Sequence, residues 1–241
     1  MSAAFLIMRR ELGAYFRSMT GYIIAAAVLV VDGILFNAFA LGGPDKRSGD
    51  VLVAFFYISS GTTMIASIFL SMRLLAEEKQ TGTLVLLTSS PIRDRDIVLG
   101  KYLSGWVFLS LITLATAFMP ALIMVHGKIS FGHLATGYLG LLLLGGAAMA
   151  IGTFGSAIAK TQVIAAIISA GLLVSLIIAW LLARITENPI NRIFESLALY
   201  HRHFPPFQVG IIHLRDVVYY LALTYFALFG ATRVLEARRW R

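Results

Sequence analysis

The sequence predicts an all-α membrane protein whose helices cross the bilayer six times. Hydrophobic residues fill 59% of the 241 positions and charged residues only 13%, and the mean hydropathy is +0.83. Such a composition is typical of a polytopic membrane protein. The apolar residues also gather into segments close to the about 20 residues that a helix needs to cross a bilayer. The expected spans cover approximately residues 21–40, 52–75, 97–125, 136–159, 163–183 and 217–232.

Little polar sequence is left outside these spans. We therefore expect residues 1–241 to form a single transmembrane domain. The chain has no cysteine, which excludes disulfides and thiolate chemistry. It also has no Ser-His-Asp set and no HExxH motif, so we expect neither a catalytic residue nor a metal site. The Gly-Lys pairs at Gly100 and Gly127 lack the remainder of a nucleotide-binding P-loop, so the chain itself is not expected to hydrolyse ATP.

Residues 3–18 are expected to form an amphipathic helix that lies flat on the membrane surface. Its apolar side carries Phe5, Met8, Leu12, Tyr15 and Phe16. The arginines at other positions around this helix are Arg9, Arg10 and Arg17. A cleavable signal peptide is disfavoured, because the basic region is too long and the next apolar run is too extended.

The first span contains a carboxylate, Asp32. An acidic residue inside a span costs several kcal/mol and often marks a functional or interhelical site. The simpler interpretation places Asp32 near the outer surface, capped by water or paired with Lys46 or Arg47, since a polar loop begins within a few turns of it. Both interpretations stay open from the sequence.

Two later spans carry residues that bear on helix packing. Pro120 should kink the third span, because proline removes a backbone donor. In the fourth span, Ala148, Gly152 and Ser156 form a ridge of small residues, which lets another helix approach closely. Lys160, Thr161 and Gln162 form a tight turn, so the fifth span is expected to be an antiparallel neighbour of the fourth.

The longest interruption, residues 184–216, is too long for an unstructured loop. Its apolar spacing predicts one or two short external or re-entrant helices before the sixth span. His201, His203 and His213 fall in or beside this connector, but without a dense carboxylate set they favour aromatic interfacial packing over metal binding.

The basic residues are distributed unevenly about the six spans. Thirteen of the twenty Lys and Arg residues fall on the side of the termini. By the positive-inside rule we expect both termini to be cytoplasmic. The net charge of +8 is thereby explained by topology and by anionic membrane lipid, so we expect no nucleic-acid partner.

The polar segment 77–91, EEKQTGTLVLLTSSP, joins the second and third spans on this cytoplasmic side. Gly82 interrupts a helical pattern, Thr83 can cap a new helix, and Ser90 precedes a proline. Residues 83–89 can therefore form only a short helix, which is marginal alone in water and should dock on its own bundle or on a soluble partner. Glu77 and Glu78 can pair with Arg73 or Lys79, or with a partner protein.

The spacing of this segment resembles the E-x-x-x-G-T-L-x-x-L-L-x-x-P-[IV] signature of ABC-2 type transporter permeases. The matching residues are Glu78, Gly82, Thr83, Leu84, Leu87, Pro91 and Ile92. The resemblance extends to the flat N-terminal helix, the six spans and the short helices before the last span. Residues 209–240 are similar to the gliding-motility-associated branch of that family. One departure is Val85, where many relatives carry Glu.

The resemblance implies that residues 83–89 form a coupling helix that fits a separate cytoplasmic ABC ATPase, which would bind ATP and Mg²⁺. The implied coupling residues are Glu77, Glu78, Gly82, Thr83, Leu84, Leu87, Thr88 and Pro91. A second copy or a homologous permease would complete the translocation unit, and the cargo would be polysaccharide, lipid-linked or hydrophobic.

Two other functions remain open from the sequence. One is a mechanotransmitting or assembly subunit that acts on a periplasmic or auxiliary membrane partner without passing substrate. The other is an ion-coupled transporter, although a lone Asp32 fits poorly with the paired charges that such a mechanism needs.

Overall fold

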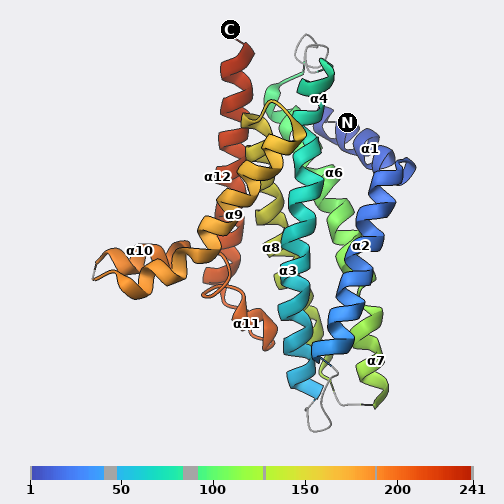
Figure 1. The fold of residues 1–241 in the computed structure, drawn as a ribbon, viewed down its shortest axis with the longest axis vertical. Helices are drawn as coiled ribbons and strands as arrows, with labels where there is room; N and C mark the ends of the chain where they lie inside the picture. The colour runs from blue at the N-terminus through green and yellow to red at the C-terminus, as the bar shows by residue number, and fades with distance from the viewer. Residues whose placement is uncertain (1, 41–47, 84–91, 127–128, 188, 240–241) are drawn as a thin grey trace.

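The computed structural model describes residues 2–40, 48–83, 92–126, 129–187 and 189–239 (Figure 1). These residues form helices and no strand. Six helical segments are long and apolar enough to cross a membrane, which confirms the predicted all-α polytopic fold. Their bounds are Met19–Phe39, Ser48–Thr81, Asp94–Ile123, Phe131–Ile158, Gln162–Ile185 and Leu214–Ala237.

The first half of the chain contributes the N-terminal helix and three spans. The helices are α1 (Ala3–Arg17), α2 (Met19–Leu35) with a π-helical turn at Phe36–Ala40, α3 (Ser48–Leu74), α4 (Ala76–Thr81), α6 (Asp94–Ala115) and α7 (Phe118–His126). The break between α6 and α7 lies one turn before Pro120, which cannot donate a backbone hydrogen bond to Thr116. The kink expected in the third span is therefore present.

The second half contributes three spans and the connector between the last two. Its helices are α8 (Phe131–Ile158), α9 (Gln162–Ile185), α10 (Ile190–Leu197), α11 (Pro205–Gln208) and α12 (Leu214–Arg239). The two short helices expected in residues 184–216 are α10 and α11. Figure 1 shows α10 and the adjoining end of α9 projecting sideways from the bundle.

Helix α8 is the centre of the bundle and packs against α3, α6, α9 and α12. Its small residues permit this close packing. A Cβ atom on Gly152 would lie 1.9 Å from Ser71 Oγ of α3, and one on Gly155 would lie 2.4 Å from Ser169 Oγ of α9. Because both neighbours occupy the space of a side chain, only glycine allows these approaches.

Both ends of the chain lie at the same end of the bundle (Figure 1). Helix α1 lies across that end and contacts α6. Its buried side chains are Ile7 and Tyr15, whereas Phe5 and Phe16 of the predicted apolar side are largely exposed. The amphipathic helix thus packs on its own bundle mainly through the face of Ile7 and Tyr15, and the Phe16 ring also contacts Phe108 of α6.

Candidate functional site

The described part of the 77–91 segment, residues 77–83, lies at the end of the bundle that carries the termini (Figure 1). Helix α3 stops at Leu74 and α4 starts again at Ala76, so the helical hydrogen-bond ladder is interrupted at Leu75. Ser156 Oγ of α8 accepts hydrogen bonds from the backbone nitrogens of Leu75 and Ala76, at 3.1 and 2.9 Å. The buried donors freed by the break are thereby satisfied.

Lys79 attaches α4 to the end of α8. Its Nζ donates to the backbone carbonyl oxygens of Ser156 and Ala159, each at 3.1 Å, and also to that of Ala157. These carbonyls lie at or just beyond the end of α8, where a cation also interacts favourably with the helix dipole. Lys79 is thus bound to backbone oxygens of the fourth span.

Lys101 of α6 joins three helices through buried charges. Its Nζ lies 2.7 Å from Glu78 Oε1 of α4 and 3.5 Å from Glu11 Oε1 of α1. The Lys101 side chain is only 3% exposed, and those of Glu78 and Glu11 are 15% and 21% exposed. A buried ammonium needs such partners, because an unpaired charge in this environment costs several kcal/mol.

Glu11 is held in its ionised form by these neighbours. Burial alone would raise its pKa, but the charge of Lys101 and the hydrogen bond from Arg10 outweigh that effect. The net result is a pKa below the ordinary value of 4.5. At neutral pH, Glu11 and Lys101 therefore form a charged pair between α1 and α6.

Glu77 makes a contact close in sequence, with Arg73 at the end of α3. Both of its carboxylate oxygens accept hydrogen bonds from Arg73, at 2.8 and 3.1 Å. The pairing of Glu77 with Arg73 is one of those considered from the sequence. Glu78 differs, because its partner is Lys101 and not the adjacent Lys79.

Gly82 ends α4 in the left-handed region, with φ of 76°. A residue with a Cβ is strained in this conformation, so glycine suits the end of this helix. Thr83 is exposed, and its Oγ1 lies 2.9 Å from Thr81 Oγ1. The other expected coupling residues lie outside the described residues; they are Leu84, Leu87, Thr88 and Pro91.

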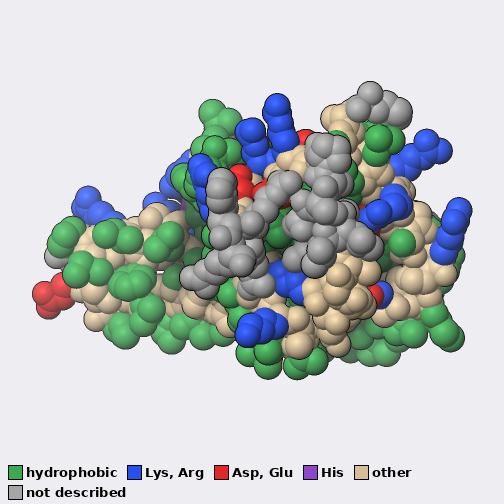
Figure 2. Space-filling model, turned by 90° about the horizontal axis from the view of Figure 1, so that it is seen from above, with side chains coloured by type: hydrophobic (Ala, Val, Ile, Leu, Met, Phe, Trp, Pro, Cys, Tyr) green, Lys and Arg blue, Asp and Glu red, His purple; other side chains and the backbone are tan. Residues whose placement is uncertain are grey.

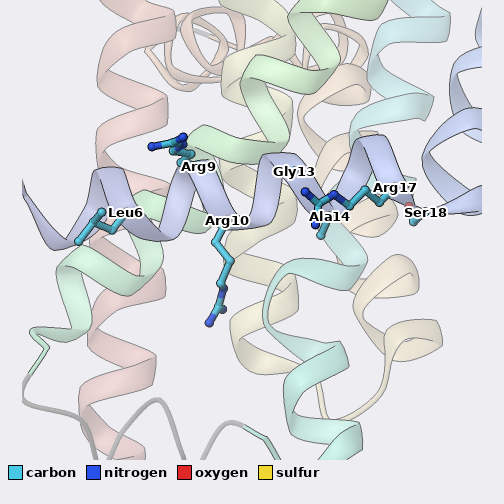
Figure 3. Close-up of a pocket in the computed structure, with 7 residues that line it drawn as sticks. All are labelled: Leu6, Arg9, Arg10, Gly13, Ala14, Arg17 and Ser18. Carbon is cyan, nitrogen blue, oxygen red and sulfur yellow. The ribbon is translucent and has the colours of Figure 1, made fainter.

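The three arginines of α1 lie around a shallow hollow on the outer side of that helix (Figure 3). Arg9 and Arg10 extend in opposite directions, and Arg17 runs back along the helix toward Gly13. Arg10 pairs with Glu11 at 2.6 Å. Within the part of the chain that the structure describes, Arg9 and Arg17 pair with no carboxylate.

Asp32 lies inside the bundle and is only 2% exposed. Its Oδ1 accepts a hydrogen bond of 2.7 Å from Thr62 Oγ1 of α3, which also lies 3.1 Å from the carbonyl oxygen of Ser59. Of the two interpretations left open by the sequence, this contact favours the interhelical one. Lys46 and Arg47, the partners considered for Asp32, fall outside the described residues.

The ridge of Ala148, Gly152 and Ser156 faces the second span. Ala148 is fully buried, Gly152 touches Ser71, and Ser156 bonds the backbone where α3 breaks. The same small residues therefore both pack the helices and position α4.

Two of the three histidines in or beside the connector, His201 and His203, make packing contacts or hydrogen bonds, whereas His213 is exposed. His201 stacks on Trp180 with ring centroids 4.2 Å apart, and His203 stacks on Tyr219 at 3.8 Å. His203 Nδ1 also lies 2.7 Å from Asp216 Oδ1, and both side chains are buried. Among the described residues, no group of three or more His, Cys, Asp and Glu residues could hold a metal ion.

Lys101 and Ser156 are the residues whose roles in positioning α4 the sequence did not reveal. Lys101 falls within the third span, and a cation inside an apolar segment is a signal that it has a buried partner. For Ser156, the sequence indicates packing but not its hydrogen bonds to the backbone of another span.

Comparison with known proteins supports the interpretation of the whole chain. A comparison with curated proteins finds no match. Residues 5–208 match the protein family described as ABC-2 family transporter protein. The match covers α1, the first five spans and the connector up to the end of α11. The chain therefore belongs to the ABC-2 family of transporter membrane proteins.

Proposed function

We propose that this chain is the permease subunit that couples ATP hydrolysis in a separate cytoplasmic ATPase to the export or extraction of a substrate. The observation that carries this proposal is the buried contact of Lys101 with Glu78 and Glu11. It links α4, directly before residues 84–91, to both the interfacial helix and the third span.

Movement of the ATPase can be transmitted only if the segment docked on it cannot shift relative to the rest of the helix bundle. Three attachments hold α4: Lys79 to the end of α8, Glu78 to α6, and Ser156 to the break after α3. Glu11 adds α1 to the same cluster. A push on residues 84–91 would therefore move α1, α3, α6 and α8 as one group rather than bend a loop.

The proposed ATPase docks at the end of the bundle that carries the termini. Figure 2 looks down on this end and shows Lys and Arg side chains scattered over it. The excess of basic residues supports a cytoplasmic location of this end by the positive-inside rule. The resemblance to ABC-2 permeases leads us to propose the inner membrane of a bacterium. ATP and Mg²⁺ would be bound by the ATPase, and this chain would contribute no catalytic residue.

We further propose that a second permease copy or a homologue completes the translocation unit. Apolar side chains of α2 are exposed in the single chain, including Tyr22, Ile23, Val30 and Ile34. Exposed apolar surface is normal for a helix that faces lipid. However, α2 has so few buried residues that a helix of a second copy can pack on it without displacing a contact within the single chain.

The alternative is a mechanotransmitting subunit that acts on a partner outside the bundle. The projecting end of α9 with α10 is the observation that favours it, because this arm could reach another protein (Figure 1). The similarity to the gliding-motility branch rests on residues 209–240, which lie beyond the family match. Under this alternative, variants of the arm should abolish binding of the partner. Under the transporter proposal, they should lower only the flux of substrate.

The proposal is tested by co-purifying the tagged chain with its cognate ATPase and measuring ATPase activity. The double change Gly82→Pro and Leu84→Asp should abolish co-purification, whereas Lys101→Met should retain the ATPase but lower its substrate- or lipid-stimulated activity. Arg233→Gln is the matched control, because Arg233 lies at the same end, is exposed and pairs with the nearby Glu236 of its own helix. Failure of the wild type to retain any ATPase would falsify the coupling proposal.

A further inference from the structure

The arm formed by the end of α9 and α10 carries a surface suited to hydrocarbon. Ile185 is 75% exposed, and Leu181, Ile190, Ile193 and Leu197 are each between 44% and 58% exposed. Scattered apolar residues need no explanation, but here they succeed one another along a thin projecting hairpin. The arm is therefore placed to lie among lipid chains.

A polar hollow interrupts this apolar arm. Trp180 and Arg184 of α9 line it from one side, and residues of α10 and of the turn after it line the other. The Trp180 ring is stacked on His201, and the Arg184 guanidinium carbon lies 4.5 Å from the ring centroid. The remaining lining residues are Ala183, Asn191, Glu195, Ala198 and Arg202. The stacking fixes the positions of the Arg184 and His201 side chains.

The charges in this hollow do not cancel. Arg202 is neutralised by Glu195, whose Oε1 lies 2.6 Å away. Arg184 pairs with no carboxylate in the described part of the chain. Burial and the charge of Arg184 lower the pKa of His201, so this ring is neutral at pH 7. One positive charge, that of Arg184, is left for an external anion.

The hollow also holds an acceptor that lacks a donor. Asn191 Oδ1 is buried and has no hydrogen-bond partner among the described residues. Buried acceptors normally receive a hydrogen bond, and an acceptor left without one costs about 1–3 kcal/mol of stability. Because this oxygen is closed off in the free chain, a hydroxyl group on a bound molecule would satisfy it once the Asn191 side chain turns toward the hollow.

We propose that this hollow binds the headgroup of an anionic lipid that carries both a phosphate and free hydroxyl groups. The phosphate would contact Arg184, a hydroxyl would donate to Asn191 Oδ1, and the acyl chains would lie along Ile185, Ile190 and Ile193. An apolar segment of a second copy would leave both Arg184 and Asn191 unsatisfied. Lipid binding at this hollow is independent of ATPase coupling, because its residues lie at the far end of α9.

Binding can be measured by native mass spectrometry of the full chain released from detergent, with added phosphatidylglycerol, phosphatidic acid or phosphatidylcholine. The wild type should retain phosphatidylglycerol in preference to the other two. Arg184→Gln should lower that affinity by roughly tenfold, the value of one charge-assisted hydrogen bond. Arg192→Gln should leave it unchanged, because Arg192 is exposed on the same arm and does not line the hollow.

A second variant separates the two headgroup contacts. Asn191→Leu should remove the preference for phosphatidylglycerol over phosphatidic acid, whose headgroup has no alcohol hydroxyl, while binding of both lipids persists. Glycerol phosphate and inorganic phosphate serve as soluble probes. If either bound as strongly as phosphatidylglycerol, the assignment of the hollow to a lipid would be overturned. Equal losses in Arg184→Gln and Arg192→Gln would show nonspecific charge attraction and reject the site. The helical circular dichroism of each variant checks its folding.

Discussion

Lys101 Nζ of α6 lies 2.7 Å from Glu78 Oε1 of α4, and this contact is almost closed off from solvent. The two residues are far apart in the sequence and belong to different spans. A buried ion pair is seldom worth much for stability against a well-packed apolar pair, but it fixes one arrangement, because neither charge tolerates separation from the other. The contact can therefore keep α4 in register with the third span while force is applied.

Replacing Lys101 with Met should destabilise the protein by about 3 kcal/mol, since it leaves Glu78 and Glu11 partly buried without their cation. Adding Glu78→Gln should recover part of this loss, because one of the two stranded charges is then removed. SDS unfolding in mixed micelles would measure both effects. Strict additivity of Lys101→Met and Glu78→Gln would contradict an interaction between them.

Acid should release α1 from the bundle. The pKa of Glu11 is lower in the folded protein than its ordinary value of 4.5. Its ionised form therefore contributes stability above about pH 4.5, and this contribution is lost as the pH falls through the lower folded-state value. The hydrogen-exchange protection factors of the α1 amides should fall in that acidic range, and in Glu11→Gln they should already be low at neutral pH. An unchanged pH profile in Glu11→Gln would assign the acid effect to another group.

The spans, the break before Pro120 and the short helices of the connector could be predicted because each depends on local sequence. Hydropathy sets a span, and a missing backbone donor sets the break. The ion pairs depended on tertiary structure. Glu78 and Lys79 are neighbours in sequence, but adjacent residues of a helix point in different directions, so they bind different partners.

The partners of buried residues could not be predicted for a related reason. The sequence left the surroundings of Asp32 open, because its neighbour Thr62 comes from the next span. The buried side of α1 is likewise set by α6, where Gly100 admits Ile7: a Cβ on Gly100 would lie 2.8 Å from Ile7 Cβ. Neither partner can be identified from periodicity within one helix.

Removing the hydroxyl of Ser156 should loosen α4. Ser156→Ala leaves the backbone nitrogens of Leu75 and Ala76 without their acceptor, at a cost of about 1–3 kcal/mol for each buried donor. Ser175→Ala is the control, because Ser175 is exposed and bonds a carbonyl of its own helix. Thermal unfolding in detergent should show a lower melting temperature for Ser156→Ala alone. Equal melting temperatures would mean that water or another group replaces the lost acceptor.

Adding a single methyl group at Gly152 should force α3 and α8 apart. The new Cβ would lie 1.9 Å from Ser71 Oγ and 2.5 Å from Ser71 Cβ, so rotation of the serine hydroxyl cannot relieve the clash. Overpacking of this kind costs about 1–3 kcal/mol, so Gly152→Ala should lower the midpoint of SDS unfolding. Gly61→Ala in α3 meets nothing within 4 Å and should be neutral or stabilising, because alanine is the better helix former. If Gly152→Ala stabilised the protein as Gly61→Ala does, α3 and α8 could not be packed as closely at Gly152 as the structure shows.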